Sequence, residues 1–185
     1  MKFIDMPRES KLDKKHFISL KHGEEVTGVL VGDPYHYYHH WEPGQSPVPC
    51  TRTDDCQLCK KGLRSSFRFQ VNMIVRENDA FVAKILEQGK TVYLDLQDHH
   101  NDCLKYNVSI ENVKTTLARN GTGTETRYRL KSNYSALSPA ILEQLKAVQL
   151  HDLEALHVPT APASSDSFGD DVPCEAPFDA SNAPF

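Results

Sequence analysis

Three cysteines and a group of histidines lie close together in the chain, at the spacing of metal ligands. Two residues separate Cys56 from Cys59, so a tight turn can bring both sulfurs to one ion, and Cys50 lies just upstream. Before them, residues 35–41 read Tyr-His-Tyr-Tyr-His-His-Trp. Thiolates and imidazoles are the ligands of closed tetrahedral zinc sites. The sequence therefore predicts a structural Zn²⁺ held by these three cysteines and one histidine.

The fourth ligand is one of three histidines, and the pattern favours His40. Side chains alternate between the two faces of a strand, so His36 and His40 share one face and His39 lies on the other. The cysteines could also be ordinary reduced thiols or a redox pair, but no βαβ pattern surrounds the Cys-x-x-Cys motif. We therefore expect a site of three cysteines and His40, with His36 and His39 as alternatives.

Part of this segment matches the pattern of zinc deaminases, which carry His-x-Glu followed by Pro-Cys-x-x-Cys. Residues 40–42 and 49–50 fit, but position 53 is threonine, and nine residues between His40 and Cys50 leave no room for the helix–turn–helix arrangement of such a site. Four protein ligands also leave no open position for a substrate. We expect no catalysis, and a zinc-dependent nucleic-acid-modifying enzyme, with Glu42 as its acid or base, is the less favoured alternative.

Aromatic and basic side chains are concentrated around the predicted metal site. Bases of a single nucleic-acid strand stack on aromatic rings for about 1–3 kcal/mol per base, and cations follow its phosphates, without selecting a sequence. Because residues 67–75 alternate apolar and polar side chains, Phe67 and Phe69 are more consistent with the core. The candidate contact residues are Tyr35, Tyr37, Tyr38, Trp41, Arg52, Lys60, Lys61, Arg64, Arg68, Arg76, Arg119, Arg127 and Arg129.

Charge is divided unevenly between a long body and a short C-terminal segment. The 185 residues carry a net charge of −4, yet residues 1–157 hold all 21 Lys and Arg residues and 20 acids. Residues 158–185 hold five acids and no base, and their prolines and small polar residues predict disorder. We expect this tail to bind a partner protein through its acidic and aromatic side chains Asp170, Asp171, Glu175, Phe178, Asp179 and Phe185.

Short alternating segments bounded by turn residues indicate a mainly β fold. We expect strands in 17–31, 66–75, 80–87, 113–118 and 126–130, an extended 91–96, a short helix from 98, and a helix beginning at Ser138-Pro139. This order fits a five-stranded OB barrel with an inserted metal loop. The predicted divisions are a polar arm at 1–15, the barrel at 16–134 with the loop at 35–64, a C-terminal helix at 135–157 and the tail at 158–185.

The sequence contains no run of eighteen apolar residues and no apolar signal region near Met1, so we expect neither a membrane span nor export. Three of the five cysteines are clustered at metal spacing, which fits a reducing cytoplasm better than a secreted disulfide scaffold.

On these residues the chain resembles bacteriophage single-stranded DNA-binding proteins of the T4 helix-destabilising type. The resemblance rests on His40-x9-Cys50-x5-Cys56-x2-Cys59, the segments 35–41 and 67–75, and the acidic tail, and it covers about residues 16–131 plus the tail. It implies an OB barrel with structural zinc, a cleft of aromatics and cations, a tail that recruits replication and repair proteins, and a host-cytoplasmic location. The aromatic-ended tail is similar to that of T7-type proteins. The ligand spacings differ from the T4 type, and the arm lacks its strongly basic cooperativity motif.

The predicted function is sequence-independent binding and protection of single-stranded DNA in replication, recombination and repair. The alternative from another class is a zinc-containing adaptor that binds a protein through the same aromatics. The two differ in salt dependence, because single-strand binding weakens steeply as salt rises. The sequence leaves the site size, the cooperativity, the choice between DNA and RNA, the tail's partners and the oligomeric state open.

Overall fold

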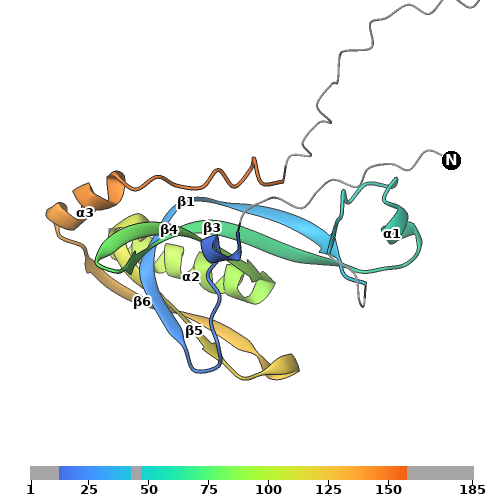
Figure 1. Cartoon of the computed structure of the whole chain (residues 1–185), viewed down its shortest axis with the longest axis horizontal. Helices are drawn as coiled ribbons and strands as arrows, with labels where there is room; N and C mark the ends of the chain where they lie inside the picture. The colour runs from blue at the N-terminus through green and yellow to red at the C-terminus, as the bar shows by residue number, and fades with distance from the viewer. Residues whose placement is uncertain (1–12, 43–46, 158–185) are drawn as a thin grey trace, which may run out of the picture. The chain divides into compact units, whose positions relative to one another are not determined.

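A computed structural model describes residues 13–42 and 47–157 of the chain (Figure 1). The predicted tail and most of the predicted N-terminal arm lie outside the described residues. The candidate partner-binding residues that lie outside with them are Asp170, Asp171, Glu175, Phe178, Asp179 and Phe185.

Within the described residues, six strands form one antiparallel sheet in the order β4-β3-β1-β5-β6, with β2 added beside β1 (Figure 1). The strands are β1 Glu25–His40, β2 Val48–Pro49, β3 Ser65–Glu77, β4 Ala80–Gly89, β5 Val113–Asn120 and β6 Arg127–Ala136. The helices are α1 Gln57–Lys60, α2 Lys90–Lys105 and α3 Pro139–Lys146, with 3₁₀ turns at Lys14–His16, Ile110–Asn112 and Gly123–Glu125.

β1 is the strand about which the sheet coils. Its residues 25–28 pair with β5 and its residues 28–31 with β3, whereas its second half pairs with β3 and, at its end, with β2. The register shifts between Val31 and Tyr35, where Gly32 has φ +77°, a conformation that suits glycine. The sequence predicted that the first strand ends at residues 31–34. That end is wrong, because the bulge absorbs Pro34 and lets the strand continue to His40.

α2 begins earlier than the sequence predicted. The segment 91–96 was expected to be extended, with a helix only from residue 98, but one helix spans Lys90–Lys105. Its buried residues Val92, Leu96, His99 and Cys103 recur at the helical spacing and form a single face against the sheet. The tertiary packing of that face outweighs the β propensity of the valine and tyrosine in the segment.

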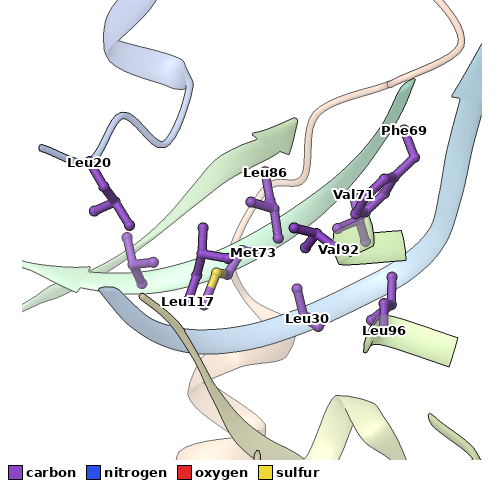
Figure 2. Close-up of a cluster of buried hydrophobic side chains, with 10 residues drawn as sticks. Leu20, Leu30, Phe69, Val71, Met73, Leu86, Val92, Leu96 and Leu117 are labelled. Carbon is purple, nitrogen blue, oxygen red and sulfur yellow. The ribbon is translucent and has the colours of Figure 1, made fainter. Parts of the chain in front are cut away.

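Two hydrophobic clusters lie on opposite sides of β3. On the inner face, α2 packs against the coiled sheet, and Figure 2 shows the labelled side chains of this core: Leu20, Leu30, Phe69, Val71, Met73, Leu86, Val92, Leu96 and Leu117. On the outer face, Val29 and Ile74 are covered by Leu145 of α3. Because side chains alternate along a strand, β3 contributes its odd-numbered apolar residues to one cluster and Ile74 to the other.

The sheet is open along one edge. Among the described residues no ladder joins β4 to β6, the pairing that would close a barrel. The prediction of a mainly β fold is therefore confirmed, whereas closure into a five-stranded barrel is not. None of the helices in the described part of the chain has the length and apolar character of a membrane span.

After α3 the chain returns along the outer face of the sheet, and we call residues 149–157 the strap (orange in Figure 1). The side-chain amide of Asn72 anchors it by donating to the backbone oxygen of His151 and accepting from its N–H, both at 3.0 Å. Leu153 of the strap is only 7% exposed. The strap therefore covers polar side chains on the outer face of β3, which do not contribute to the inner core.

Candidate metal centre and aromatic surfaces

The predicted metal ligands lie at the end of β1, just after β2, and at the start of α1, which meet at one end of the sheet. His40 is the last residue of β1, and β2 pairs back on it through Val48. This pairing turns the chain so that the backbone N–H of Cys50 donates to the Tyr38 carbonyl at 2.8 Å. Cys59 lies in α1 and Cys56 immediately before it, so that one helical turn brings both sulfurs to the same side.

The four donor atoms lie within 4.8 Å of one another. His40 Nε2 is 3.4 Å from the Cys56 sulfur and 3.5 Å from the Cys59 sulfur, and the Cys50 sulfur is 3.9 Å and 3.5 Å from the same two sulfurs. Zn–S bonds of about 2.3 Å would place tetrahedral ligands about 3.8 Å apart. The cluster could therefore hold a metal ion and is consistent with zinc.

The electrostatics of the cluster also suit a cation. A hydrogen bond from the Cys59 backbone, with help from His40 and the neighbouring sulfurs, lowers the pKa of Cys56 to about 6. Hydrogen bonding to Cys50 raises the pKa of Cys59. The negative charge of one thiolate disfavours ionisation of the neighbouring thiol, and a bound cation offsets this repulsion. His40 is fully buried, and its Nδ1 has no hydrogen-bond partner among the described residues, so packing orients the ring.

The other two histidines do not join the cluster. His36 lies on the inner face, where its ring centroid is 6.2 Å from that of Phe67. His39 lies on the outer face, 6.2 Å from the ring of Tyr37. The structure thus brings His40, and neither His36 nor His39, to the three sulfurs.

Aromatic rings form a row on the inner face beside the metal loop. The Arg52 guanidinium lies 4.2 Å from the centre of the Tyr38 ring. The Tyr38 and Phe67 centroids are 5.5 Å apart, and those of Phe67 and Tyr93 are 5.1 Å apart. We call Tyr38, Phe67 and Tyr93 the inner aromatic row. All three are half-buried, so each ring packs on the core with one part and leaves another uncovered.

The inner row leads toward a cleft at the open edge of the sheet. The cleft has a volume of about 710 Å³ and lies between the end of β4, the start of α2 and the start of β6. Four cations line it against one acid, Asp95. We call it the edge cleft, and its cations are Arg68, Lys90, Arg127 and Arg129.

On the outer face, Tyr35 and Tyr37 are covered by the strap. The His157 ring stacks on Tyr35 at 4.8 Å and lies 4.3 Å from the ring of Tyr37. Burial, with a smaller contribution from Glu87, raises the pKa of Tyr37. These two tyrosines therefore already have an aromatic partner, although the sequence predicted them as free stacking surfaces.

The remaining candidate contact residues do not lie together in the structure. Trp41 is 59% exposed near the metal loop. Arg76 lies at the far end of β3, about 36 Å along the strand from Ser65, and pairs with Asp79 at 3.0 Å. Around the metal loop, three exposed cations lie close in sequence to the ligands, namely Lys60, Lys61 and Arg64.

Arg119 serves the fold. Its guanidinium donates to the Leu20 carbonyl and to Thr126 Oγ1, and it lies 5.7 Å from the ring centre of Tyr128. Those partners tie β5 to the N-terminal segment and leave the cation half-buried.

Sequence reasoning did not find Tyr93 or Lys90. Both belong to the start of α2, where the sequence predicted an extended segment at 91–96 and no helix before residue 98. The apolar spacing of Val92, Leu96, His99 and Cys103 is the signal that could have revealed the helix. Comparison of the chain with protein-family models, with curated proteins and with solved structures finds no match.

Proposed function

We propose that the protein binds single-stranded DNA without sequence preference and protects it in the cytoplasm during replication, recombination and repair. The observation that carries the proposal is the inner aromatic row, which has Arg52 at one end and the edge cleft at the other. Stacking rings beside cations are the features that a single strand requires. No step of this function is catalytic.

The chemistry of the row suits bases and phosphates together. Tyr38 and Tyr93 offer ring surface that any base can cover, and stacking does not depend on the base's hydrogen-bonding edge. Arg127 and Arg129 are exposed and alternate along β6 with half-buried Tyr128. Neither forms an ion pair with another described residue, so both can neutralise phosphates without losing a structural partner. The local excess of cations compensates for a nearly neutral body.

The placement of these residues agrees with an OB-type architecture, which is part of the proposal. An OB fold binds nucleic acid on its second and third strands, between the loop after the first strand and the loop between the last two. Here β3 and β4 would be those strands. The metal loop and residues 121–126 would be the two loops, and the inner row and edge cleft lie between them.

In this proposal the metal is a structural zinc ion. It would tie the loop from residue 41 to 64 to the end of β1 through His40. Arg52 follows Cys50 by two residues, so fixing the sulfur of Cys50 also limits where the guanidinium can lie relative to Tyr38. The tail, which lies outside the described residues, would recruit replication or recombination proteins through its acids and phenylalanines.

Fluorescence anisotropy with a labelled oligo(dT), at about 50 and 200 mM salt, tests the proposal, with a duplex of the same length as control. We expect tight, salt-sensitive binding to the single strand only. Tyr38→Ala should weaken it about tenfold, from the loss of one stacked base. The control variant Arg76→Ala should bind as wild type, because Arg76 lies far along β3. If the wild-type protein does not bind single strands, the proposal is refuted and the adaptor function is favoured.

A further inference from the structure

At the end of the strap, the ring of His157 packs against two tyrosines on the outer face. The His157 ring is nearly parallel to Tyr35, at 17° with centroids 4.8 Å apart, and is tilted by 41° to Tyr37 at 4.3 Å. Its Nε2 lies 3.0 Å from Gln70 Oε1. Gln70 is 3% exposed. A planar nitrogen heterocycle is therefore stacked on Tyr35, tilted against Tyr37 and hydrogen-bonded at its edge.

We propose that Tyr35, Tyr37 and Gln70 form a second nucleobase-binding pocket, which His157 of the strap occupies while the protein is free of DNA. The proposal rests on the proposed function, because the base would come from the same single strand that the inner face binds. When a base enters, the last turn of the strap lifts and His157 leaves the pocket.

The polar side of the pocket is already oriented to accept a hydrogen bond. The Gln70 amide donates through Nε2 to Glu87 at 2.9 Å, which leaves its Oε1 facing the imidazole. A ligand must therefore present an N–H at the edge of a flat aromatic ring. Base edges carry such donors, and their faces stack on tyrosine in a sequence-tolerant way.

The His157 ring that occupies the pocket is uncharged, as a nucleobase is. Burial lowers the pKa of His157 and outweighs the opposing effect of Glu87, so the ring is neutral at neutral pH. The charged neighbours of the pocket are Glu87 and Arg68, and Arg68 is paired across the strands with Tyr37. Arg68 supplies a cation for the phosphate beside a bound base.

The occupant can leave without unfolding the strap. Asn72 and Leu153 anchor the earlier part of the strap, through two amide–backbone bonds and a buried side chain. The last turn closes with one backbone hydrogen bond, from His157 to the Glu154 carbonyl at 2.9 Å, and Glu154 itself is exposed. Displacement of His157 therefore moves one turn and leaves the anchor in place.

The test uses the full chain and the same labelled oligo(dT). His157→Ala empties the pocket, and we expect it to bind about three- to tenfold more tightly and to cover more nucleotides per molecule, because the closed state no longer competes. His157→Phe keeps a ring over the tyrosines and should remain near wild type. Adding Tyr35→Ala to His157→Ala should remove the gain. Thermal unfolding of each variant identifies those that fold.

The outcomes separate the two proposals. If the wild type does not bind oligo(dT), the proposed function fails. If the wild type binds but His157→Ala has the same affinity and site size, or gains affinity without needing Tyr35, the second pocket is refuted. A measurement on the wild type does not depend on variants: the His157 ring proton signals should move toward unstacked positions when oligo(dT) is added. Unchanged signals at saturation would overturn the proposal.

Discussion

The two faces of β1 beyond its bulge carry similar side chains but meet different surroundings. Tyr37 and Tyr38 are adjacent in the sequence, yet a strand places them on opposite faces. Tyr38 contacts Phe67 and Arg52 on the inner face, next to the edge cleft. Tyr37 lies under His157 on the outer face. One aromatic segment thus forms two surfaces, of which one is open and the other is filled by the protein's own chain.

This difference shows that aromatic density alone does not define a binding surface. The two faces differ in the element that packs against them. α2 borders the inner face and contributes Tyr93 and Lys90, whereas the strap covers the outer face. The basic side chains also differ in what they contact. Arg127 and Arg129 border the open cleft, and Arg119 is bound within the fold.

Removing the metal should have the largest effect on both faces of β1, because the strand ends at His40. Chelation or Cys56→Ser should lower the free energy of unfolding by several kcal/mol, on the order of 5, and disorder the loop after residue 41. We expect one zinc ion per chain by elemental analysis in the wild type and a large loss in the variant. Cys103→Ser, at a cysteine outside the cluster, should keep its zinc. Equal zinc content in both variants would contradict the assignment.

Leu153→Ala should open the outer face selectively. Its buried side chain anchors the strap, and a buried Leu→Ala substitution costs about 2–5 kcal/mol, toward the low end where a segment can relax. Hydrogen exchange should become faster at the His151 N–H, which donates to Asn72. The exposed strap residue Leu150 provides the control, since Leu150→Ala should change stability by less than about 0.5 kcal/mol. Unchanged exchange at His151 would show that Leu153 does not hold the strap.

Substitution of Arg127 and Arg129 tests whether the edge cleft on the open face binds single-stranded DNA. Replacing both with alanine should reduce the slope of log affinity against log salt by about 1.4, the value for two lost phosphate contacts on a single strand. The measurement is an oligo(dT) titration at four salt concentrations. Lys131 lies on the same strand but pairs with Glu25 at 3.2 Å, so Lys131→Ala should leave the slope unchanged. An identical slope for the double variant would remove the edge cleft from the interface.

The smallest expected effect concerns His99 of α2, which is buried and hydrogen-bonded to Thr115 of β5 at 2.9 Å. Burial lowers its pKa, so below about pH 6.5 the unfolded chain takes up a proton that the folded chain does not. Stability should therefore fall as the pH drops through this range, by at most about 1.4 kcal/mol per pH unit from this residue.

Urea unfolding between about pH 5 and 7, at one fixed zinc concentration, measures this contribution. His99→Gln should flatten the profile, whereas His100→Gln, at the exposed neighbour on α2, should reproduce the wild-type profile. Parallel profiles for the wild type and His99→Gln would show that His99 does not contribute to the pH dependence.

The sequence by itself was sufficient for features that depend on local spacing. His40 and the three cysteines lie within twenty residues, and a short strand pairing and one helical turn bring them together. Alternation in residues 67–75 likewise predicted that Phe69 and Met73 enter the core, and both are fully buried. It set Gln70 and Asn72 on the opposite face, yet they are buried as well, because the strap covers that face. The mainly β character followed from the same periodicity.

Only the tertiary structure decided which of the aromatics and cations remain available. The strap reaches Tyr35 and Tyr37 from more than a hundred residues away, and Arg119 finds its acceptor at Leu20. The exposure of a side chain depends on what packs against it, and those neighbours come from distant parts of the chain, so no local pattern records them. The position of Tyr93 in the inner row has the same cause, because it required both a helix and its docking on the sheet.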